Sequence, residues 1–273
     1  MTGLETKFAA DYPRDPLINF VTEAGPHGRD DAPAGRVPAQ TIQRGAFITL
    51  EGGEGVGKST QVRRIVARLE AAGIKAIATR EPGGSPKAET LRQVLLSGAA
   101  KALGPKAEAI LFAAARIDHI DRLIQPALAA GTWVVCDRFA DSTRAYQGAL
   151  GGVDPPFLRA LERVTLAGIK PDLTLILDLP ASVGLVRAAA RRPANAPVDR
   201  FESENLRFHE ALRDAYLAIA IAEPERCAVI DASASEADVA EAIWQRIQRR
   251  LPQFLSPESS LRSSPSSGPS HGA

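Results

Sequence analysis

A glycine-rich segment at residues 52–59 restricts the possible folds of this chain more than any other part of its sequence. The segment has the spacing Gly-x-x-x-x-Gly-Lys-Ser. An apolar run at 46–51 precedes it, and residues 61–72 follow with apolar side chains three or four positions apart, as in an amphipathic helix. In this context of strand, glycine loop and helix start, the spacing predicts a phosphate-binding loop and not a glycine-rich turn that binds nothing.

A loop of this kind binds the phosphates of a nucleotide through its backbone. Its glycines allow N–H groups to surround a triphosphate, and the positive end of the helix dipole faces the same anion. Lys58 is then expected to reach the β- and γ-phosphates, and the Ser59 hydroxyl to coordinate Mg²⁺. The residues predicted to bind ATP are Gly52, Gly53, Glu54, Gly55, Val56, Gly57, Lys58, Ser59 and Thr60.

Composition limits the function without naming it. Of the 273 residues, 45% are apolar and 24% are charged, and the net charge of +1 provides no overall field for nucleic acid or an anionic membrane. No stretch approaches the roughly 18 consecutive apolar residues of a membrane span, and the N-terminus lacks an apolar signal core. Cys136 and Cys227 each lie in a short apolar run, which indicates buried strands in a reducing cytoplasm and not a disulfide or metal site.

The chain divides into a central region and two polar extensions. Residues 1–44 mix prolines, glycines and charges without any period, and residues 252–273 are rich in serine, proline and glycine. Both extensions are therefore predicted to be disordered. Residues 45–251 are predicted to form one α/β domain.

Within this domain, short apolar runs alternate with helical patterns. Strands are expected at 46–51, 75–79, 132–137, 173–178 and 227–231. Helices are expected at 58–72, 86–97, 105–129, 155–168, 180–192, 203–222 and 235–250. Strands separated by helices predict a parallel five-stranded sheet of the phosphate-loop NTPase type, with helices on both faces and ligands bound beyond the carboxyl ends of the strands. The residues at those ends are Gly52, Arg80, Asp137 and Asp178.

Charged residues at two strand ends suit phosphoryl transfer. Asp137 stands where a phosphate-loop enzyme usually places a second Mg²⁺ partner, direct or through water, although an aspartate there could instead cap the next helix. Arg138 follows it, with a planar guanidinium suited to an acceptor phosphate. Arg80 ends the second strand. A surface ion pair would explain either arginine alone, but the two together favour a dianionic monophosphate as their ligand.

Two further segments have an arrangement suited to the same site. Phe112 and Arg116 are four residues apart in a predicted helix and share one face, where they could stack on a base and bond its edge. A place in the core is the simpler interpretation of Phe112. The arginine-rich stretch 187–202 passes through a proline and asparagine loop, which suits a lid that brings positive charge over a triphosphate, or a solvated basic loop.

Together these segments resemble the bacterial thymidylate kinases, a family of nucleoside monophosphate kinases. The resemblance covers about residues 45–250. It rests on motifs that occur in order at 51–60, 79–84, 111–116, 137–139, 141–148, 171–178 and 199–202. The Thr-Arg-Glu-Pro-Gly-Gly motif at 79–84 and the Ser-Thr-x-Ala-Tyr-Gln-Gly motif at 142–148 are quite specific to this family.

The resemblance implies ATP-dependent phosphorylation of dTMP to dTDP, with Mg²⁺, by a cytoplasmic homodimer that supplies dTTP. It implies that Glu54 contacts the 3′-hydroxyl of the acceptor sugar, that Phe112 stacks on thymine and that Arg116 contacts its carbonyl edge. Arg80 and Arg138 would hold the acceptor phosphate. The rest of the pocket would be lined by Ser142, Thr143, Tyr146 and Gln147, with Tyr146 disfavouring a 2′-hydroxyl.

The lid is expected to supply positive charge to the transferring phosphate. One subgroup of the family carries an arginine in the phosphate loop, but positions 53–56 here hold no basic residue. The other subgroup uses its lid, which here spans about 188–202. Arg191 best matches the lid position, and the lesser candidates are Arg187, Arg192 and Arg200. The expected catalytic residues are Lys58, Asp137, Arg138 and Arg191.

Three departures and two rival functions accompany this resemblance. The lid contains an insert at 193–197, which leaves the register of the individual lid arginines open. Phe139 stands where a tyrosine or histidine is more familiar, and the leader of 44 residues has no counterpart.

A kinase for another acceptor is one rival, although an acceptor without phosphate would leave Arg80 and Arg138 without a shared partner. A nucleotide-dependent switch is the other, but the Asn/Thr-Lys-x-Asp guanine motif of GTPase switches does not occur after any predicted strand.

Overall fold

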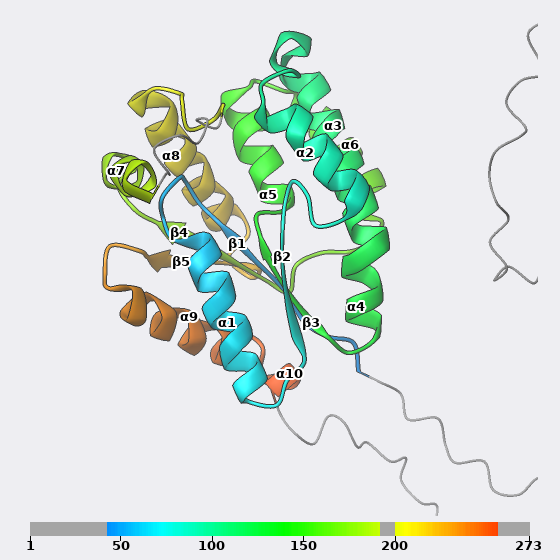
Figure 1. Cartoon of the computed structure of the whole chain (residues 1–273), viewed down its shortest axis with the longest axis vertical. Helices are drawn as coiled ribbons and strands as arrows, with labels where there is room; N and C mark the ends of the chain where they lie inside the picture. The colour runs from blue at the N-terminus through cyan, green and yellow to red at the C-terminus, as the bar shows by residue number, and fades with distance from the viewer. Residues whose placement is uncertain (1–42, 192–199, 256–273) are drawn as a thin grey trace, which may run out of the picture. The chain divides into compact units, whose positions relative to one another are not determined.

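The computed structural model describes residues 43–191 and 200–255, all within the unit Gln40–Ala273. They contain a five-stranded parallel sheet with the strand order β2-β3-β1-β4-β5 (Figure 1). The strands are β1 (Phe47–Glu51), β2 (Ala76–Arg80), β3 (Trp133–Asp137), β4 (Leu173–Asp178) and β5 (Cys227–Asp231). The predicted α/β fold class is therefore confirmed, and each strand end lies within one residue of its expected position.

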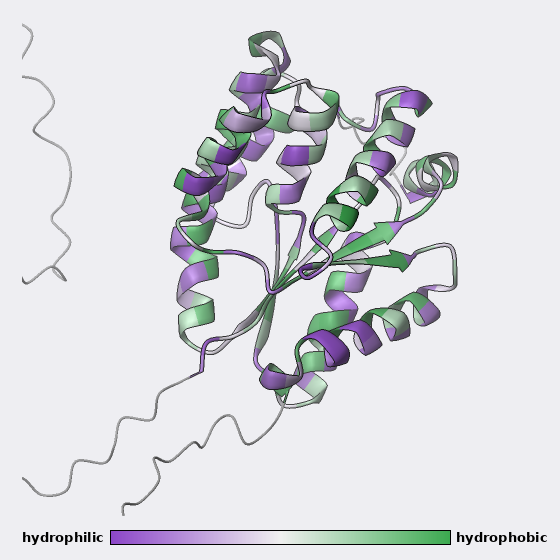
Figure 2. Ribbon diagram, turned by 180° about the vertical axis from the view of Figure 1, so that it is seen from behind, coloured by the Kyte–Doolittle hydropathy of each residue, from purple (hydrophilic) through white to green (hydrophobic). Residues whose placement is uncertain are grey.

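Helices cover both faces of the sheet. Successive residues of a strand point to opposite faces, and in the central strands the residues on both faces are mostly apolar and buried. On one face, Ile48 and Leu50 of β1 pack in a cluster with α1 (Lys58–Ala71) and α9 (Glu236–Arg250). On the other face, Phe47 packs in a second cluster with Ile120, Ile124 and Leu128. Figure 2 shows the strands as mainly hydrophobic ribbons between helices that carry hydrophilic residues on their outer sides. A sheet covered on both faces explains the nearly continuous apolar runs of the sequence.

Most helices lie where the periodicity predicts them. They are α1, α2 (Pro86–Leu96), α6 (Pro155–Leu166), α7 (Ala181–Arg191), α8 (Leu206–Ala222) and α9. The long helix expected at 105–129 is observed as α3 (Gly104–His119), a π-helical turn η2 (Ile120–Ile124) and α4 (Gln125–Ala129), after a short 3-10 turn η1 (Lys101–Leu103). Within the described ranges, we find no helix that combines the length and the apolar character of a transmembrane span.

One helical segment was not predicted. After β3 the chain forms α5 (Ala140–Thr143) and continues directly into the π-helical segment η3 (Arg144–Leu150). The stretch mixes small, polar and β-branched residues with a glycine, so it shows no apolar period of 3.6. π-Helical segments occur frequently at functional sites. Here α5 carries Ser142 and Thr143, and η3 carries Tyr146 and Gln147, which are four of the predicted pocket residues.

The packed region extends beyond the expected boundary at residue 251. Residues Pro252–Leu255 form the helical turn α10, and the Phe254 ring lies edge-on to Trp133 at 5.9 Å between centroids. The guanidinium of Arg44 lies 5.8 Å from the centroid of the same ring. The predictions made for residues 1–42, for 256–273 and for the lid residues 192–199 lie outside the described part of the chain.

Candidate active site

A cavity of about 260 Å³ opens at the carboxyl edge of the sheet, where β1, β2 and β3 end. It brings together most of the residues predicted from the sequence: Glu54, Gly55, Gly57, Lys58, Ser59, Arg80, Phe112, Arg116, Asp137, Arg138, Ser142, Thr143, Tyr146, Gln147 and Arg191. Gly52, Gly53 and Val56 line a smaller cavity toward α8 instead, and Thr60 lies in the first turn of α1. The sequence prediction did not include Glu81, Pro82, Arg92, Leu96, Phe139, Phe201 and Glu202, which also line the main cavity.

The phosphate loop has a closed conformation that depends on two glycines. Gly55 has a φ of +68°, and a Cβ atom on it would lie 1.9 Å from the carbonyl oxygen of Gly184 in α7. A Cβ atom on Gly184 would in turn lie 2.3 Å from the carbonyl oxygen of Glu54. The backbone of the loop and the first turn of α7 can approach this closely only because both positions lack a side chain.

Lys58 lies at the start of α1 and points into the cavity. Its Nζ donates to the carbonyl oxygens of Gly52 at 3.2 Å and Gly53 at 2.6 Å. Burial lowers the pKa of Lys58 to about 8, and the nearby Arg138 acts in the same direction against the carboxylates of Glu54 and Asp137. The amine is therefore protonated at neutral pH and is positioned for a phosphate.

Ser59 and Asp137 meet because β1 and β3 are neighbours in the sheet. The Ser59 hydroxyl donates to Oδ2 of Asp137 at 2.5 Å. A hydroxyl and a carboxylate are hard oxygen donors, and Mg²⁺ is usually held by one or two such protein groups together with phosphate oxygens and water. The pair therefore fits the metal role predicted for it.

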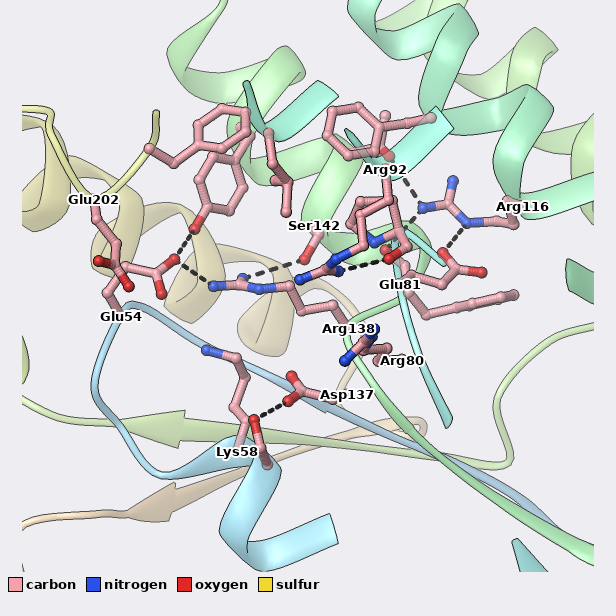
Figure 3. A pocket seen from close by; sticks show the side chains of 18 of the residues that line it. Glu54, Lys58, Arg80, Glu81, Arg92, Arg116, Asp137, Arg138, Ser142 and Glu202 are labelled. Carbon is pink, nitrogen blue, oxygen red and sulfur yellow. Dashed lines mark hydrogen bonds and ion pairs between the residues drawn. The ribbon is translucent and has the colours of Figure 1, made fainter. Parts of the chain in front are cut away.

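Arg138 crosses the cavity between Glu54 and Ser142 (Figure 3). Its Nη2 donates to Glu54 at 2.6 Å, and its Nη1 donates to the carbonyl oxygen of Gly52 at 3.1 Å. The Tyr146 hydroxyl donates to the same Glu54 oxygen at 2.9 Å. Burial would raise the pKa of Glu54, but Arg138, Lys58 and the Tyr146 hydroxyl together outweigh it and lower that pKa to about 2. Glu54 is therefore a carboxylate throughout the physiological range.

Arg116 reaches the cavity from α3 as part of a buried ion pair. It is 4% exposed, and its Nε donates to Glu81 at 2.6 Å, while Nη2 donates to the carbonyl oxygen of Phe139 at 3.1 Å. Nδ1 of His119 lies 3.1 Å from the other oxygen of Glu81. Glu81 thus fixes the direction of the Arg116 guanidinium. Its place inside the Thr-Arg-Glu-Pro-Gly-Gly motif was the available signal for this role.

Phe112 is half-buried on the cavity wall, unlike the fully buried alanine Ala113 beside it. Its ring lies 6.4 Å from that of Phe201, which in turn lies edge-on to Tyr146 at 4.9 Å. The three rings form an aromatic wall from three separate segments of the chain. Phe201 belongs to the motif at 199–202, but nothing local in the sequence indicated that its ring reaches this wall.

The segment that carries Ser142, Thr143, Tyr146 and Gln147 is anchored from behind by charges. Asp141, whose side chain is 4% exposed, accepts two hydrogen bonds from Arg226, at 2.6 and 3.0 Å. It accepts a third from Arg144 at 3.2 Å. Because Arg226 immediately precedes β5, these bonds connect α5 and η3 to the start of an edge strand of the sheet.

The remaining arginines differ in their partners. Arg80 ends β2, lines the cavity and is 57% exposed, with its guanidinium 3.2 Å from Glu89 of α2. Arg187 donates to the carbonyl oxygen of Ala232 at 3.0 Å, and Arg200 pairs with the buried Glu108. Of the lid candidates in the described ranges, Arg191 alone lines the cavity. The position of Arg192 lies outside those ranges.

The cavity joins a triphosphate loop to a second compartment with an aromatic wall and cationic side chains. A parallel sheet that presents both compartments at its carboxyl edge defines a phosphate-loop kinase of the nucleoside monophosphate type.

Comparisons with known proteins identify the family within this class. The thymidylate kinase family model matches residues 50–243. The thymidylate kinase of Nitrobacter winogradskyi is 60% identical over 213 residues, which cover 78% of this chain and 92% of that protein. That of Bradyrhizobium diazoefficiens is 58% identical over 208 residues, which cover 76% and 91%. The crystal structure of thymidylate kinase from Ehrlichia chaffeensis superposes with a TM-score of 0.60 at 29% identity, over 75% of this chain and all of that one.

The chain belongs to the thymidylate kinase family. It is a nucleoside monophosphate kinase, and its family phosphorylates dTMP to dTDP with ATP for the synthesis of dTTP.

Proposed function

We propose that the phosphate loop binds ATP, that the aromatic compartment binds dTMP, and that the γ-phosphoryl group passes between them in line. The observation that carries this proposal is the continuity of one cavity from Lys58 and Ser59 to Phe112 and Arg116. Donor and acceptor sites in a single cavity allow the two reacting groups to be held in contact, which is most of what phosphoryl transfer requires of a protein.

The acceptor side is assigned by chemistry. Phe112 stacks on thymine, and Arg116, oriented by Glu81, bonds the carbonyl edge of the base. The ionised Glu54 accepts a hydrogen bond from the 3′-hydroxyl of the sugar, and a charged acceptor makes this bond stronger. Ser142, Thr143, Tyr146 and Gln147 close the remaining wall, with the Tyr146 ring at the place where a 2′-hydroxyl would lie.

The phosphate of the acceptor is assigned to Arg138 and Arg80. The guanidinium of Arg138 already faces the carboxylate of Glu54, so it stands at the boundary between the two compartments. Arg80 lies at the end of the neighbouring strand, and its exposed pairing with Glu89 is weak enough to be exchanged for a phosphate. Two guanidinium groups suit a dianion better than one.

Ser59 and Asp137 are assigned to Mg²⁺, the second directly or through water. When bound, the ion neutralises charge on the β- and γ-phosphate oxygens. The chain itself supplies Lys58 on the donor phosphates, Arg138 on the acceptor and Arg191 on the transferring group. A monophosphate oxygen is already ionised near neutral pH, so the site needs no strong general base.

We also propose that the protein is a homodimer that acts in the cytoplasm. Exposed apolar side chains lie on the packed helices α2, α3 and α6: Val94, Ile110, Ile117 and Val164. A second copy of the chain would cover them, and light scattering of the purified protein measures the mass directly. The two cysteines are free and buried, which suits a reducing compartment.

The test is ADP production with MgATP and a panel of acceptors: dTMP, dUMP, dCMP, dGMP, AMP, GMP, UMP and thymidine. Strong turnover with dTMP, weaker turnover with dUMP and negligible turnover with the others supports the assigned pocket. Fastest turnover with any other acceptor would overturn the roles of Phe112 and Arg116. Omission of Mg²⁺ is expected to abolish turnover in every case.

A further inference from the structure

Glu51 is a fully buried carboxyl group that none of the assigned roles uses. It ends β1 one residue before the phosphate loop and is 0% exposed. Its Oε1 accepts the backbone N–H of Phe139 at 2.7 Å. Its Oε2 accepts the hydroxyls of Ser142 at 2.7 Å and Tyr216 at 3.1 Å. A buried acid with three donors directed at it holds those donors in place.

The first of these donors stabilises an unusual backbone conformation. Arg138 has a φ of +70°, in the left-handed region that residues with a Cβ atom rarely adopt. The side chain of Arg138 lines the cavity, and the next backbone N–H, that of Phe139, is the one that Glu51 accepts. The bond from Glu51 therefore acts on the turn at Arg138.

The other two donors touch the guanidinium itself. Nη1 of Arg138 donates to the Tyr216 hydroxyl at 3.0 Å and to the Ser142 hydroxyl at 3.4 Å. Each hydroxyl that donates to Glu51 thus offers a lone pair to Arg138. Glu51 is connected to the backbone and to the side chain of the same arginine by separate hydrogen-bonded routes.

We propose that Glu51 is a positioning residue for Arg138. Glu51 sets both the left-handed turn at Arg138 and the direction of its guanidinium, which binds the acceptor phosphate. The inference rests on the proposed role of Arg138 in binding dTMP and adds the group that makes this role possible.

The ionisation of Glu51 provides a readout that a purely structural role lacks. Burial, followed by the charge of Asp141, raises the pKa of Glu51 to about 7, against the opposing effects of Arg138 and the hydrogen bonds. As a carboxylate, Glu51 accepts both hydroxyls and leaves their lone pairs to Arg138. As an acid, it must donate to one of them and loses its attraction for the guanidinium. The titratable and charged groups that act with it are Lys58 of α1, Cys136 of β3, Arg138, Asp141 of α5, Tyr146 of η3 and Tyr216 of α8.

The experiment measures the KM for dTMP and for ATP in Glu51→Ala, Glu51→Gln and Arg138→Ala. We expect Glu51→Ala to raise the KM for dTMP about tenfold, the effect of one lost hydrogen bond to a charged group, and the KM for ATP less than threefold. Glu51→Gln keeps an acceptor for Phe139 and is expected within threefold of wild type at pH 6. The wild-type to Glu51→Gln ratio of kcat/KM for dTMP is expected to rise through pH 7, because only the carboxyl group titrates.

The outcomes separate the inference from the function on which it rests. An unchanged KM for dTMP in Arg138→Ala would refute the assignment of that arginine. A strong effect of Arg138→Ala, with Glu51→Ala folded and normal in its KM for dTMP, would overturn the positioning role alone. A pH ratio that stays flat, or equal losses of dTMP and ATP affinity, would also overturn it.

If Glu51→Ala does not fold, Tyr216→Phe tests the same route with a smaller change. Tyr216 does not line the main cavity, and its hydroxyl contacts both Glu51 and Arg138. We expect a rise of about threefold to tenfold in the KM for dTMP. The control is Thr165→Val, which removes a buried hydroxyl bonded only to its own helix in α6 among the described contacts. Equal KM values for dTMP in the two variants would refute the inference.

Discussion

The donor half of the cavity is formed mainly by one continuous segment, residues 54–59, whereas the acceptor half draws on several separated segments of the chain. The loop is expected to bind its ligand mainly through backbone N–H groups and one lysine, so its conformation depends on the glycines within it. The acceptor half combines Glu54 of the loop with side chains from the ends of β2 and β3, from α3, from α5 and η3, and from residues 201–202. Each of these has to be aimed individually.

Buried charged residues behind the cavity wall orient the side chains of the acceptor half, and they form a second layer around it. Glu81 holds Arg116, Glu51 reaches Arg138, and Arg226 holds Asp141 beneath the segment of Ser142 and Tyr146. The phosphate loop is instead contacted by two cations that line the cavity itself, since Lys58 and Arg138 both donate to its carbonyl oxygens. The comparison therefore predicts that distant substitutions impair dTMP binding selectively, whereas donor binding responds to the loop itself.

The largest effect is expected where the two halves meet. Arg191→Ala should lower kcat about 10³-fold or more, because an arginine on the transferring phosphate acts in the transition state and not in either ground state. Steady-state kinetics should show KM values for dTMP and ATP within a few-fold of wild type. Arg187→Ala, whose guanidinium bonds Ala232 instead, is the matched control. A normal kcat for Arg191→Ala would remove this residue from the mechanism.

The next effect tests the second layer of the acceptor half. Asp141→Ala leaves Arg226 without its nearly buried partner and should lower the free energy of unfolding by about 3 kcal/mol. Urea unfolding measures the loss, and kinetics should show a raised KM for dTMP with little change for ATP. Glu241→Ala breaks the exposed pair with Arg68 and should leave the unfolding curve nearly unchanged. Equal curves for both variants would contradict the role of the charged anchor.

A smaller effect separates the two compartments by their ligands. Phe112→Ala removes the stacking surface for thymine and should weaken dTMP binding by about 1–3 kcal/mol, measured by calorimetry. ATP binding should remain nearly intact. Phe157→Ala, another half-buried phenylalanine outside the cavity, controls for lost packing. Equal loss of both ligands in Phe112→Ala would show that this ring is part of the core.

The smallest effect is confined to the donor half and follows pH. The lowered pKa of Lys58, about 8, means that the free enzyme loses the proton on this amine as pH rises through that value. The kcat/KM for ATP should then fall up to tenfold for each pH unit above about 8, because a neutral amine does not hold a phosphate. The kcat/KM for dTMP at saturating ATP should not follow, since bound phosphates favour the charged lysine. A flat ATP profile to pH 9.5 would contradict this prediction.

The sequence was sufficient wherever structure depends on neighbours along the chain. The apolar runs located all five strands, and periodicity located six helices and the long helix of α3 to α4. The spacing at 52–59 located the phosphate loop, because a loop built from backbone N–H groups is encoded by the glycines within it. Motif resemblance also named most residues that line the cavity, although their individual roles stay predictions.

Only the tertiary structure decided which groups orient these residues. The α5 and η3 segment shows no apolar period in the sequence, and the ion pair that anchors it joins Asp141 to Arg226, 85 residues away. Glu81 and Phe201 have no local feature that sets their direction. A strand end, a helix and a loop become neighbours only when the sheet brings its carboxyl ends together. Since a buried ion pair or an aromatic contact forms between positions far apart in sequence, no local pattern contains it.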